Sequence, residues 1–278
     1  MRRRAFITAL SGAAAWPFTA RAQQQGDQVR ALQIRILRMQ AEAVAAMIGQ
    51  FIREIEAQVG WTTQMPWSPR TFEQRRFDGS RLLRQVPAIT ELSQLDPTGH
   101  EQLRVSRLTM DLVGSQRDYS NDPKFTEAVA HKVYYGPVYF PRPVGPQGGP
   151  QVPGEPSMTL SVVGRRGDAG VSVAEVGLKL IQDAVTKLKV GEHGVAYVLD
   201  AQSRVIAHPD RSLIAADFSG LDQVQAARGA GSATPPQSLQ AVKDINGHAV
   251  LAAYAHVAPL GWLVFVELPD EEAGALPQ

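Results

Sequence analysis

The stretch QVRALQIRILRMQAEAVAAMIGQFIREIEAQV, residues 28–59, decides the plan of this chain. It has no proline and one glycine, and its apolar residues recur at steps of three and four, the spacing of one helix face. The stripe comprises Val44, Met47, Ile48, Phe51, Ile52, Ile55 and Val59, and a comparable stripe upstream comprises Leu32, Ile36, Met39, Ala43 and Ala46. We predict one helix over 28–60, about 45–50 Å long at 1.5 Å per residue. It packs on its own domain, runs along two modules, or pairs with a second copy in a homodimer.

Downstream of this helix the apolar period becomes two, which is typical of strands. Strands are expected at 88–95, 102–112, 133–140, 157–163, 169–176, 194–200, 204–208, 240–245, 249–256 and 262–268, and helices at 71–86, 122–132 and 178–189. The order predicts an α+β chain in which the long helix precedes two modules with antiparallel sheets, 61–177 and 178–270.

Turn residues separate several of these strands. Asp96-Pro97-Thr98-Gly99 and Asn246-Gly247 are sequences that favour tight turns between antiparallel strands. The stretch 141–156 holds six prolines and four glycines and is expected to be a long irregular excursion. A shorter loop is expected at Gly229–Pro236.

Upstream of the helix the chain begins MRRRAFITALSGAAAWPFTARA, a basic cluster, a short apolar run and an Ala-x-Ala site. This pattern predicts a signal peptide over 1–22 and a periplasmic location, with an uncleaved anchor in the inner membrane as the alternative. Arg3-Arg4 also fits a twin-arginine signal, although an ordinary signal with an incidental arginine remains open. Cleavage would remove Arg2, Arg3, Arg4 and Arg21, leaving 24 of 28 basic residues against 27 acidic ones, so the net charge would change from +1 to −3.

Nothing in the residues supports catalysis, a metal or a cofactor. A mildly acidic mature chain offers no electrostatic basis for binding nucleic acid. Cysteine is absent, and the six histidines show no metal-ligand spacing. His208-Pro209-Asp210 brings an imidazole near a carboxylate, but no nucleophile accompanies them. No phosphate-binding glycine pattern occurs. We therefore expect a protein that is not an enzyme.

Three separated motifs resemble double Cache sensor domains. The first is DYSNDPKFTEA, 118–128, with YGPVY at 135–139, and it resembles the membrane-distal module. GVAYVLD at 194–200 with VIAHPD at 205–210, and LGWLVFVE at 260–267, resemble the membrane-proximal module. The likeness covers roughly residues 28–268 in the right order. It implies two PAS-like modules on a long helix, outside the membrane, with a small-molecule ligand held by the distal one.

The resemblance also implies where that ligand binds. Aromatic and polar residues gather in the first motif and on the last distal strand, and the candidate ligand-binding residues are Tyr119, Asp122, Lys124, Phe125, Tyr135, Tyr139 and Glu175. Tyrosines of this kind also pack cores, and Glu175 could simply face solvent.

In relatives that bind amino acids, an Arg and an aromatic residue stand where this chain has Asp122 and Lys124, and an Asp stands at Glu175. Loss of the Arg argues against a free amino acid, since Arg binds carboxylates bidentately. Arg75, Arg76 or Arg81 could supply a replacement cation.

The chain departs from the usual family plan at both ends, because a signal replaces the first membrane helix and the sequence stops soon after the last strand. We therefore expect sensing without an output domain, through a membrane-bound signalling partner. The alternatives are the detached sensory region of a histidine kinase or nucleotide cyclase, and a scaffold that dimerises through the long helix.

Overall fold

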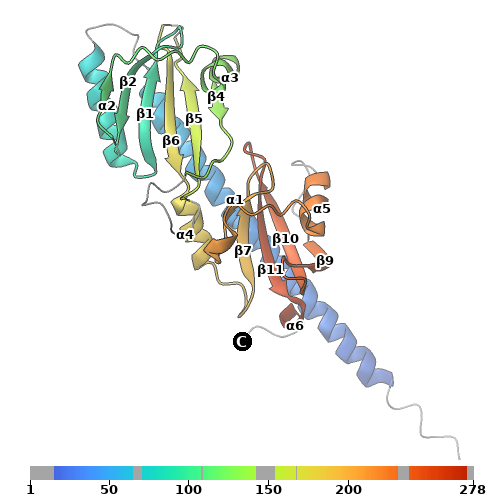
Figure 1. Cartoon of the computed structure of the whole chain (residues 1–278). Helices are drawn as coiled ribbons and strands as arrows, with labels where there is room; N and C mark the ends of the chain where they lie inside the picture. The colour runs from blue at the N-terminus through green and yellow to red at the C-terminus, as the bar shows by residue number, and fades with distance from the viewer. Residues whose placement is uncertain are drawn as a thin grey trace, which may run out of the picture.

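A computed structural model describes residues 16–64, 71–107, 109–141, 154–166, 168–230 and 238–273 of the chain. Its spine is α1 (Trp16–Trp61), 46 residues long, which lies along two sheets placed one beyond the other (Figure 1). The helix contacts β5 and β6 of one sheet and β10 and β11 of the other. One helix therefore carries both sheets.

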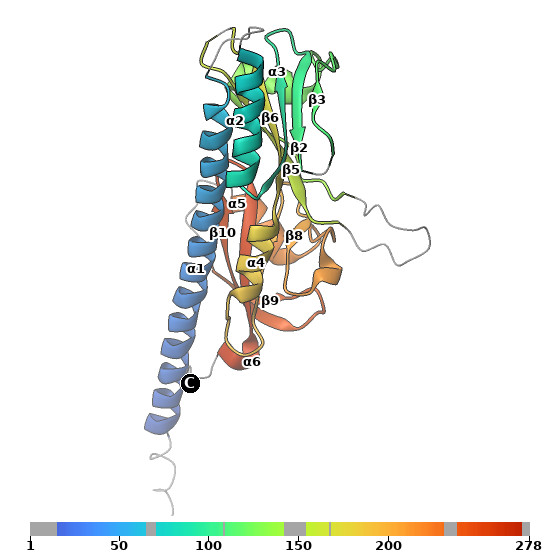
Figure 2. The ribbon, with the colours of Figure 1, turned by 90° about the vertical axis from the view of Figure 1, so that its left-hand side faces the viewer.

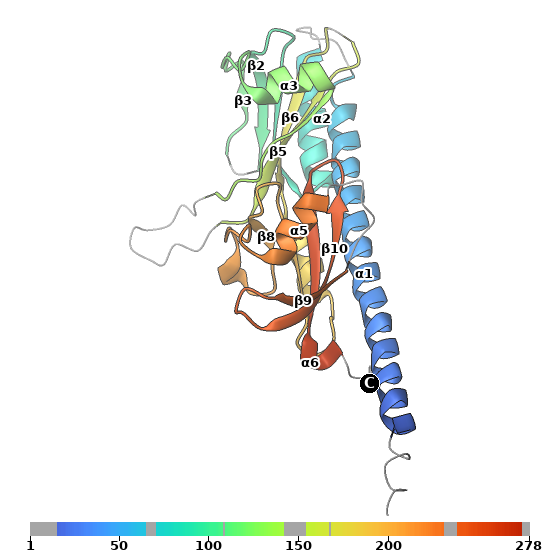
Figure 3. The same ribbon diagram turned by 90° about the vertical axis from the view of Figure 1, so that its right-hand side faces the viewer.

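The first sheet has the strand order β3-β2-β1-β6-β5-β4, and each neighbouring pair is antiparallel. Its strands are β1 (Ile89–Leu95), β2 (Glu101–Ser106), β3 (Leu112–Val113), β4 (Val133–Tyr135), β5 (Ser157–Val163) and β6 (Val171–Gly177). Helices α1 and α2 (Phe72–Gln85) cover one face, and α3 (Pro123–His131) lies on the other (Figures 2 and 3). These elements form the first module.

The second sheet has the order β8-β7-β11-β10-β9 and is also antiparallel. Its strands are β7 (Val195–Leu199), β8 (Val205–Ala207), β9 (Ser238–Lys243), β10 (Ala249–Val257) and β11 (Trp262–Pro269). The helices beside it are α4 (Lys179–Lys187), α5 (Asp222–Ala230) and α6 (Asp270–Ala273). These elements form the second module, in which α5 lies on the face away from α1 (Figure 3).

The side of both sheets that faces α1 forms one continuous core. Ile48, Ile52 and Ile55 of α1 are at most 2% exposed and belong to the same apolar cluster as Leu160 of β5 and Val264 of β11. Because side chains alternate between the faces of a strand, the opposite faces carry separate clusters under α3 and under α5. The first of these opposite faces holds the candidate site.

The α+β class with two antiparallel sheets is confirmed, as are the two turns. Asp96 accepts hydrogen bonds from the backbone of Thr98 and His100, and Gly99 between them has φ +90°, so the chain reverses between β1 and β2. Gly247 has φ +85° and joins β9 to β10. Glycine adopts this left-handed conformation without steric cost.

Two expected strands differ from the structure, and one helix of the structure was not expected. The strand expected at 102–112 ends at Ser106 and resumes as the short β3. The strand expected at 133–140 ends at Tyr135, and only Tyr139 pairs again, in an isolated bridge with Ser157. Helix α5 was not expected, because glycines near its end, at 229 and 231, resembled loop sequence. The rest of the expected Gly229–Pro236 loop, and most of the 141–156 excursion, lie outside the described residues.

Helix α1 also begins earlier than the sequence predicts, at Trp16 rather than near residue 28. Pro17 suits a first helical turn, where a missing N–H costs nothing, and no proline follows before the helix ends. The helix therefore overlaps the end of the expected signal peptide. No helix within the described ranges has a stretch long and apolar enough to cross a membrane.

The two apolar stripes of α1 behave differently. The downstream stripe packs into the shared core, whereas upstream Leu32 and Met39 are 49% and 59% exposed. Beside them, α1 and α4 enclose an apolar groove of about 490 Å³. The groove is lined by Ile36, Met39, Gln40, Ala43, Val44, Met47, Ala184 and Leu188. The helix thus runs along two modules, and part of it still presents an apolar surface.

Candidate ligand-binding site

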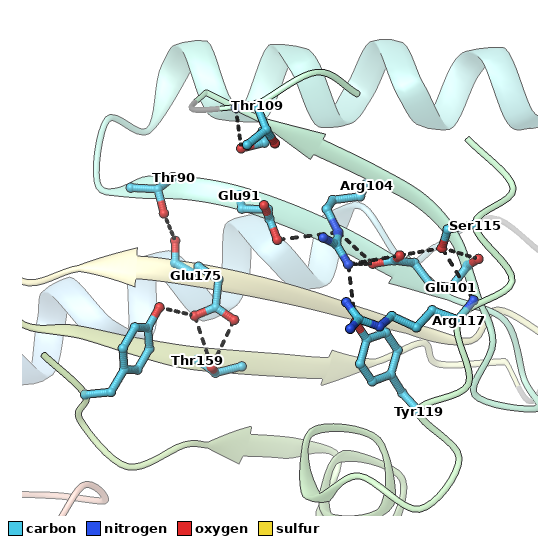
Figure 4. A network of polar contacts seen from close by, with 12 residues as sticks. Thr90, Glu91, Glu101, Arg104, Thr109, Ser115, Arg117, Tyr119, Thr159 and Glu175 are labelled. Carbon is cyan, nitrogen blue, oxygen red and sulfur yellow. Dashed lines mark hydrogen bonds and ion pairs between the residues drawn. The ribbon is translucent and has the colours of Figure 1, made fainter. Parts of the chain in front are cut away.

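The face of the first sheet turned toward α3 carries an unusual share of polar side chains, which we call the polar face. Strand register places Glu175 of β6 between Glu91 of β1 and Thr159 of β5, on the same side as Val171 and Val173 of the cluster under α3. The polar face comprises Glu91, Glu101, Arg104, Thr159 and Glu175 (Figure 4), together with Ser161, which strand register places on the same side. Polar groups convergent beside an apolar cluster are what a small-molecule site requires.

Glu175 is held at the centre of this face by neutral donors. The hydroxyl of Tyr139 donates to its Oε2 at 2.6 Å, and the hydroxyl of Thr159 lies 3.0 Å from both carboxylate oxygens. Burial raises the pKa of Glu175 above its usual value, against the opposing effects of these hydrogen bonds and of Lys124. Among the described residues no ion pair includes Glu175. The carboxylate is therefore fixed in place but lacks a cation of its own.

Arg104 of β2 is already engaged by two carboxylates. Its guanidinium forms ion pairs with Glu101 at 2.8 Å and with Glu91 at 3.6 Å, and it donates to the Tyr119 hydroxyl at 3.2 Å (Figure 4). Burial lowers the pKa of Arg104, but the hydrogen bond and charge of Glu101 outweigh it and the net direction is upward. Glu91 and Glu175 lie opposite each other on neighbouring strands, where like charges repel. This face thus has more carboxylates than Arg104 can neutralise.

Helix α3 brings the first sequence motif over the edge of this face. Asp122 caps the helix, since its Oδ1 accepts the backbone N–H of Lys124 at 3.0 Å. The ammonium of Lys124 lies 3.7 Å from the centre of the Tyr119 ring and 3.8 Å from Asp122. Asp122 therefore has a structural role, and Lys124 is balanced by it and by the ring.

The remaining wall is aromatic. Tyr119, Phe125 and Tyr134 pack against the apolar cluster under α3. Beside them the hydroxyl of Ser161, on a residue with no exposed surface, has no hydrogen-bond partner in the part of the chain that the structure describes. A buried polar atom without a partner is costly, so this hydroxyl would gain stability from a hydrogen bond to a ligand atom.

Two expectations about the site need correction. Tyr135 points to the opposite face of the sheet and donates to Glu56 of α1 at 2.6 Å, because Tyr134 and Tyr135 are neighbours on a strand and must face opposite sides. The replacement cation does not come from α2. Arg75 is 1% exposed and bonds to Gln94 at 3.0 Å on that same opposite face, whereas Arg104 of β2 lies on the polar face.

The structure brings together Tyr119, Lys124, Phe125, Tyr139 and Glu175, with Asp122 at the helix cap. Sequence reasoning missed Glu91, Glu101, Arg104, Thr159 and Ser161. Alternation would have placed Thr159 and Ser161 on one face of β5, but only the register between strands shows that this face also carries Glu175 and Arg104.

His208, which lies two residues before Asp210 in the sequence, has a structural role. His208 is 7% exposed, and its ring nitrogen Nδ1 accepts the backbone N–H of Asp210 at 2.9 Å. Burial lowers the pKa of His208. Within the described part of the chain no group of three or more His, Asp or Glu side chains could hold a metal ion.

Comparisons with known proteins agree on one family. A family model described as a Cache domain matches residues 21–275. No curated protein matches the sequence significantly. Among solved structures, the ligand-binding domain of the Campylobacter jejuni chemoreceptor Tlp3 in complex with 4-methylisoleucine aligns with a TM-score of 0.67 at 11% identity, covering 90% of this chain and 96% of that one.

Two further structures align nearly as well. The extracellular domain of the putative histidine kinase soHK1S-Z6 has a TM-score of 0.62 at 17% identity, covering 88% of this chain and 97% of that one. The ligand-binding domain of the Pseudomonas aeruginosa PAO1 chemoreceptor PctB in complex with L-Arg has a TM-score of 0.57 at 17% identity, covering 86% and 89%. Identities this low establish a shared fold only.

Proposed function

Because this chain belongs to the Cache domain family, whose characterised relatives are sensor domains and not catalytic ones, we propose that it binds a small molecule on the polar face of its first module and passes the bound state to a signalling protein. In this proposal the helix over 28–60 supports a membrane-distal module, 61–177, and a membrane-proximal module, 178–270. The observation that carries the proposal is Glu175, a partly buried carboxylate with neutral donors and no ion pair among the described residues.

The charges around Glu175 favour a ligand that contains an ammonium group. An ammonium could donate to Glu175 and Glu91 at once, relieving the repulsion between them. A ligand carboxylate has less to bind, because Arg104 is taken up by Glu91 and Glu101 and Lys124 by Asp122. The related PctB and Tlp3 domains were solved with amino acids, which carry both groups. For this chain we favour amines without a carboxylate.

A thermal-shift screen of the purified protein against amines, organic acids, purines and amino acids tests this proposal. At 100 times its Kd a ligand stabilises the folded state by about 2.7 kcal/mol, which raises Tm by about 5 °C or more. We expect amines to give the shift and Glu175→Gln to abolish it while changing the unliganded Tm little. Glu127→Gln, at an exposed position of α3, serves as the control and should keep the shift. A full shift in Glu175→Gln would exclude this residue from the site.

Amine binding should also weaken as the pH falls. Burial raises the pKa of Glu175, so its carboxyl becomes neutral at a higher pH than an ordinary glutamate, and a neutral carboxyl cannot pair with an ammonium. Below that pKa the affinity should drop by up to about tenfold per pH unit, while an alkylammonium, with a pKa of about 10, stays charged. Calorimetric titrations between neutral and acid pH measure this dependence, and affinity that rises on acidification would contradict it.

The N-terminal sequence favours export and therefore a periplasmic sensor. The Arg3-Arg4 pair, the apolar run and Ala20-Arg21-Ala22 fit a twin-arginine signal peptide that is cleaved after residue 22. A protein released there needs a membrane-bound partner to report its state across the membrane, and chemoreceptors and histidine kinases with this fold are candidates for such a partner. N-terminal sequencing of the exported protein distinguishes cleavage from an uncleaved inner-membrane anchor.

We further propose that the protein is a homodimer through the exposed part of α1. Leu32, Ile36, Met39, Ala43 and Ala46 are separated by steps of four and three, the heptad spacing of a helix that packs against a second helix. Met39→Glu places a charge in this seam and should shift the protein to a monomer in analytical ultracentrifugation. Gln58→Glu, exposed on the same helix but about three turns beyond Ala46, the last residue of the seam, should leave the mass unchanged. Monomeric wild-type protein at high concentration would refute the dimer.

A further inference from the structure

The segment Val138–Phe140 links the polar face to the second module. Its middle residue, Tyr139, holds Glu175 through its hydroxyl at 2.6 Å and pairs with the backbone of Ser157. The carbonyl of the preceding residue, Val138, accepts a hydrogen bond from Nη2 of Arg204 at 2.6 Å. Arg204 belongs to the turn between β7 and β8 of the second module. Tyr139 therefore contacts the first module and its neighbour Val138 contacts the second.

Arg204 is itself held firmly by its own module. Its guanidinium forms an ion pair with Asp200, with Nε 2.8 Å and Nη2 2.6 Å from Oδ2. Asp200 has no exposed surface, and its other oxygen accepts the backbone N–H groups of Gln202 and Arg204 at 2.9 Å. A movement of the guanidinium would therefore be transmitted to the turn that joins β7 to β8.

Phe140 completes the connection. Its ring packs against both the core shared with α1 and the cluster under α5, and the Arg204 guanidinium lies 5.2 Å from the ring centre. The segment thus has a hydrogen bond to the site on one side, and a hydrogen bond and a cation–π contact to the second module on the other.

We infer that the Val138–Phe140 segment and Arg204 couple the occupancy of Glu175 to the conformation of the second module. The inference rests on the proposed function only for what occupies Glu175. A ligand cation takes over the carboxylate and competes with the Tyr139 hydroxyl, which is a neutral and weaker donor. Once released from Glu175, Tyr139 no longer fixes the segment, and the Val138 carbonyl moves relative to Arg204. Because Arg204 holds the turn at Asp200–Arg204 through Asp200, the conformation of this turn changes as well.

The coupling is testable without any ligand, by hydrogen–deuterium exchange of the full protein. Tyr139→Phe removes the hydroxyl that binds Glu175, and we expect exchange at the amides of Gln202, Arg204 and Val205 to rise about fivefold. Thr159→Val removes the other hydroxyl on Glu175, from strand β5, to which Arg204 makes no hydrogen bond among the described residues, and should leave these amides unchanged. An unchanged turn in Tyr139→Phe, or equal increases in both variants, would overturn the inference.

A second experiment tests whether the effect of Tyr139→Phe on the turn depends on Arg204. The double variant Asp200→Asn with Arg204→Met removes both charges together, so that neither is left buried alone. Adding Tyr139→Phe in this background should produce no further increase in exchange at the turn, and a repeated fivefold increase would also overturn the coupling. If the double variant fails to fold, the comparison of Tyr139→Phe with Thr159→Val decides by itself. Because no ligand is used, a negative result bears on the coupling, whereas the ligand screen bears on the proposed function.

Discussion

Replacing Arg204 by methionine alone is expected to destabilise the protein by about 3 kcal/mol, which corresponds to a fall in Tm of about 6–12 °C for a chain of this size. The cause is the carboxylate of Asp200, which is completely buried and would lose its ion-pair partner. We place the effect at the lower end of the range for buried pairs because the Arg204 side chain is 32% exposed and water weakens its charge. Denaturant unfolding followed by circular dichroism measures the loss.

The matched control is the double variant Asp200→Asn with Arg204→Met. An asparagine at position 200 still accepts the backbone N–H groups of Gln202 and Arg204 and needs no cation. This variant should therefore recover most of the stability that Arg204→Met loses. If the single and double variants are equally unstable, the loss comes from packing on Phe140 and not from the unpaired charge.

Replacing Ile52 by alanine should cost about 2–5 kcal/mol, the usual range for an isoleucine deleted from a packed core. Ile52 is 1% exposed on α1 and lies in the apolar cluster that includes residues of both sheets. Because the same helix supports both modules, we expect one cooperative transition shifted as a whole. Far-ultraviolet circular dichroism and tryptophan fluorescence, to which the buried Trp262 of the second module contributes, together show whether the transitions coincide.

Met39→Ala provides the control on the same helix. Met39 is 59% exposed, so its truncation should change the free energy of unfolding of the monomer by at most about 0.5 kcal/mol. Equal losses for Ile52→Ala and Met39→Ala would mean that the upstream stripe is buried in solution. Two separate transitions in Ile52→Ala would instead show that the modules unfold independently.

The sequence alone was enough for the class of fold and for several residues of the candidate site. The three- and four-residue steps of Ile48, Ile52 and Ile55 predicted the buried face of α1, and turn residues such as Gly99 and Gly247 separated the strands correctly. These are local properties, since a helix period, a strand period and a left-handed glycine depend only on near neighbours in the chain. The resemblance also named Tyr139 and Glu175 among the candidate ligand-binding residues, and their side chains are hydrogen-bonded to each other.

Tertiary structure decided which side chains share a face. Tyr134 and Tyr135 are interchangeable in an alternating pattern, and only the packing of α1 and α3 on opposite sides of the sheet turned Tyr135 to Glu56 and Tyr134 to the site. Likewise, Arg75 was buried by the docking of α2 and Arg104 entered the site through strand register.

Contacts between the two modules could not be predicted from the sequence either. Val138 and Arg204 are 66 residues apart, and nothing in either motif indicates that one carbonyl and one guanidinium meet. The residues of this chain by themselves determined most of its helices, its alternating strands and its turns, because those depend on local spacing. The facing of each strand, the ion pairs across strands and the joint between the modules were set only when distant segments packed, because burial and register belong to the whole fold.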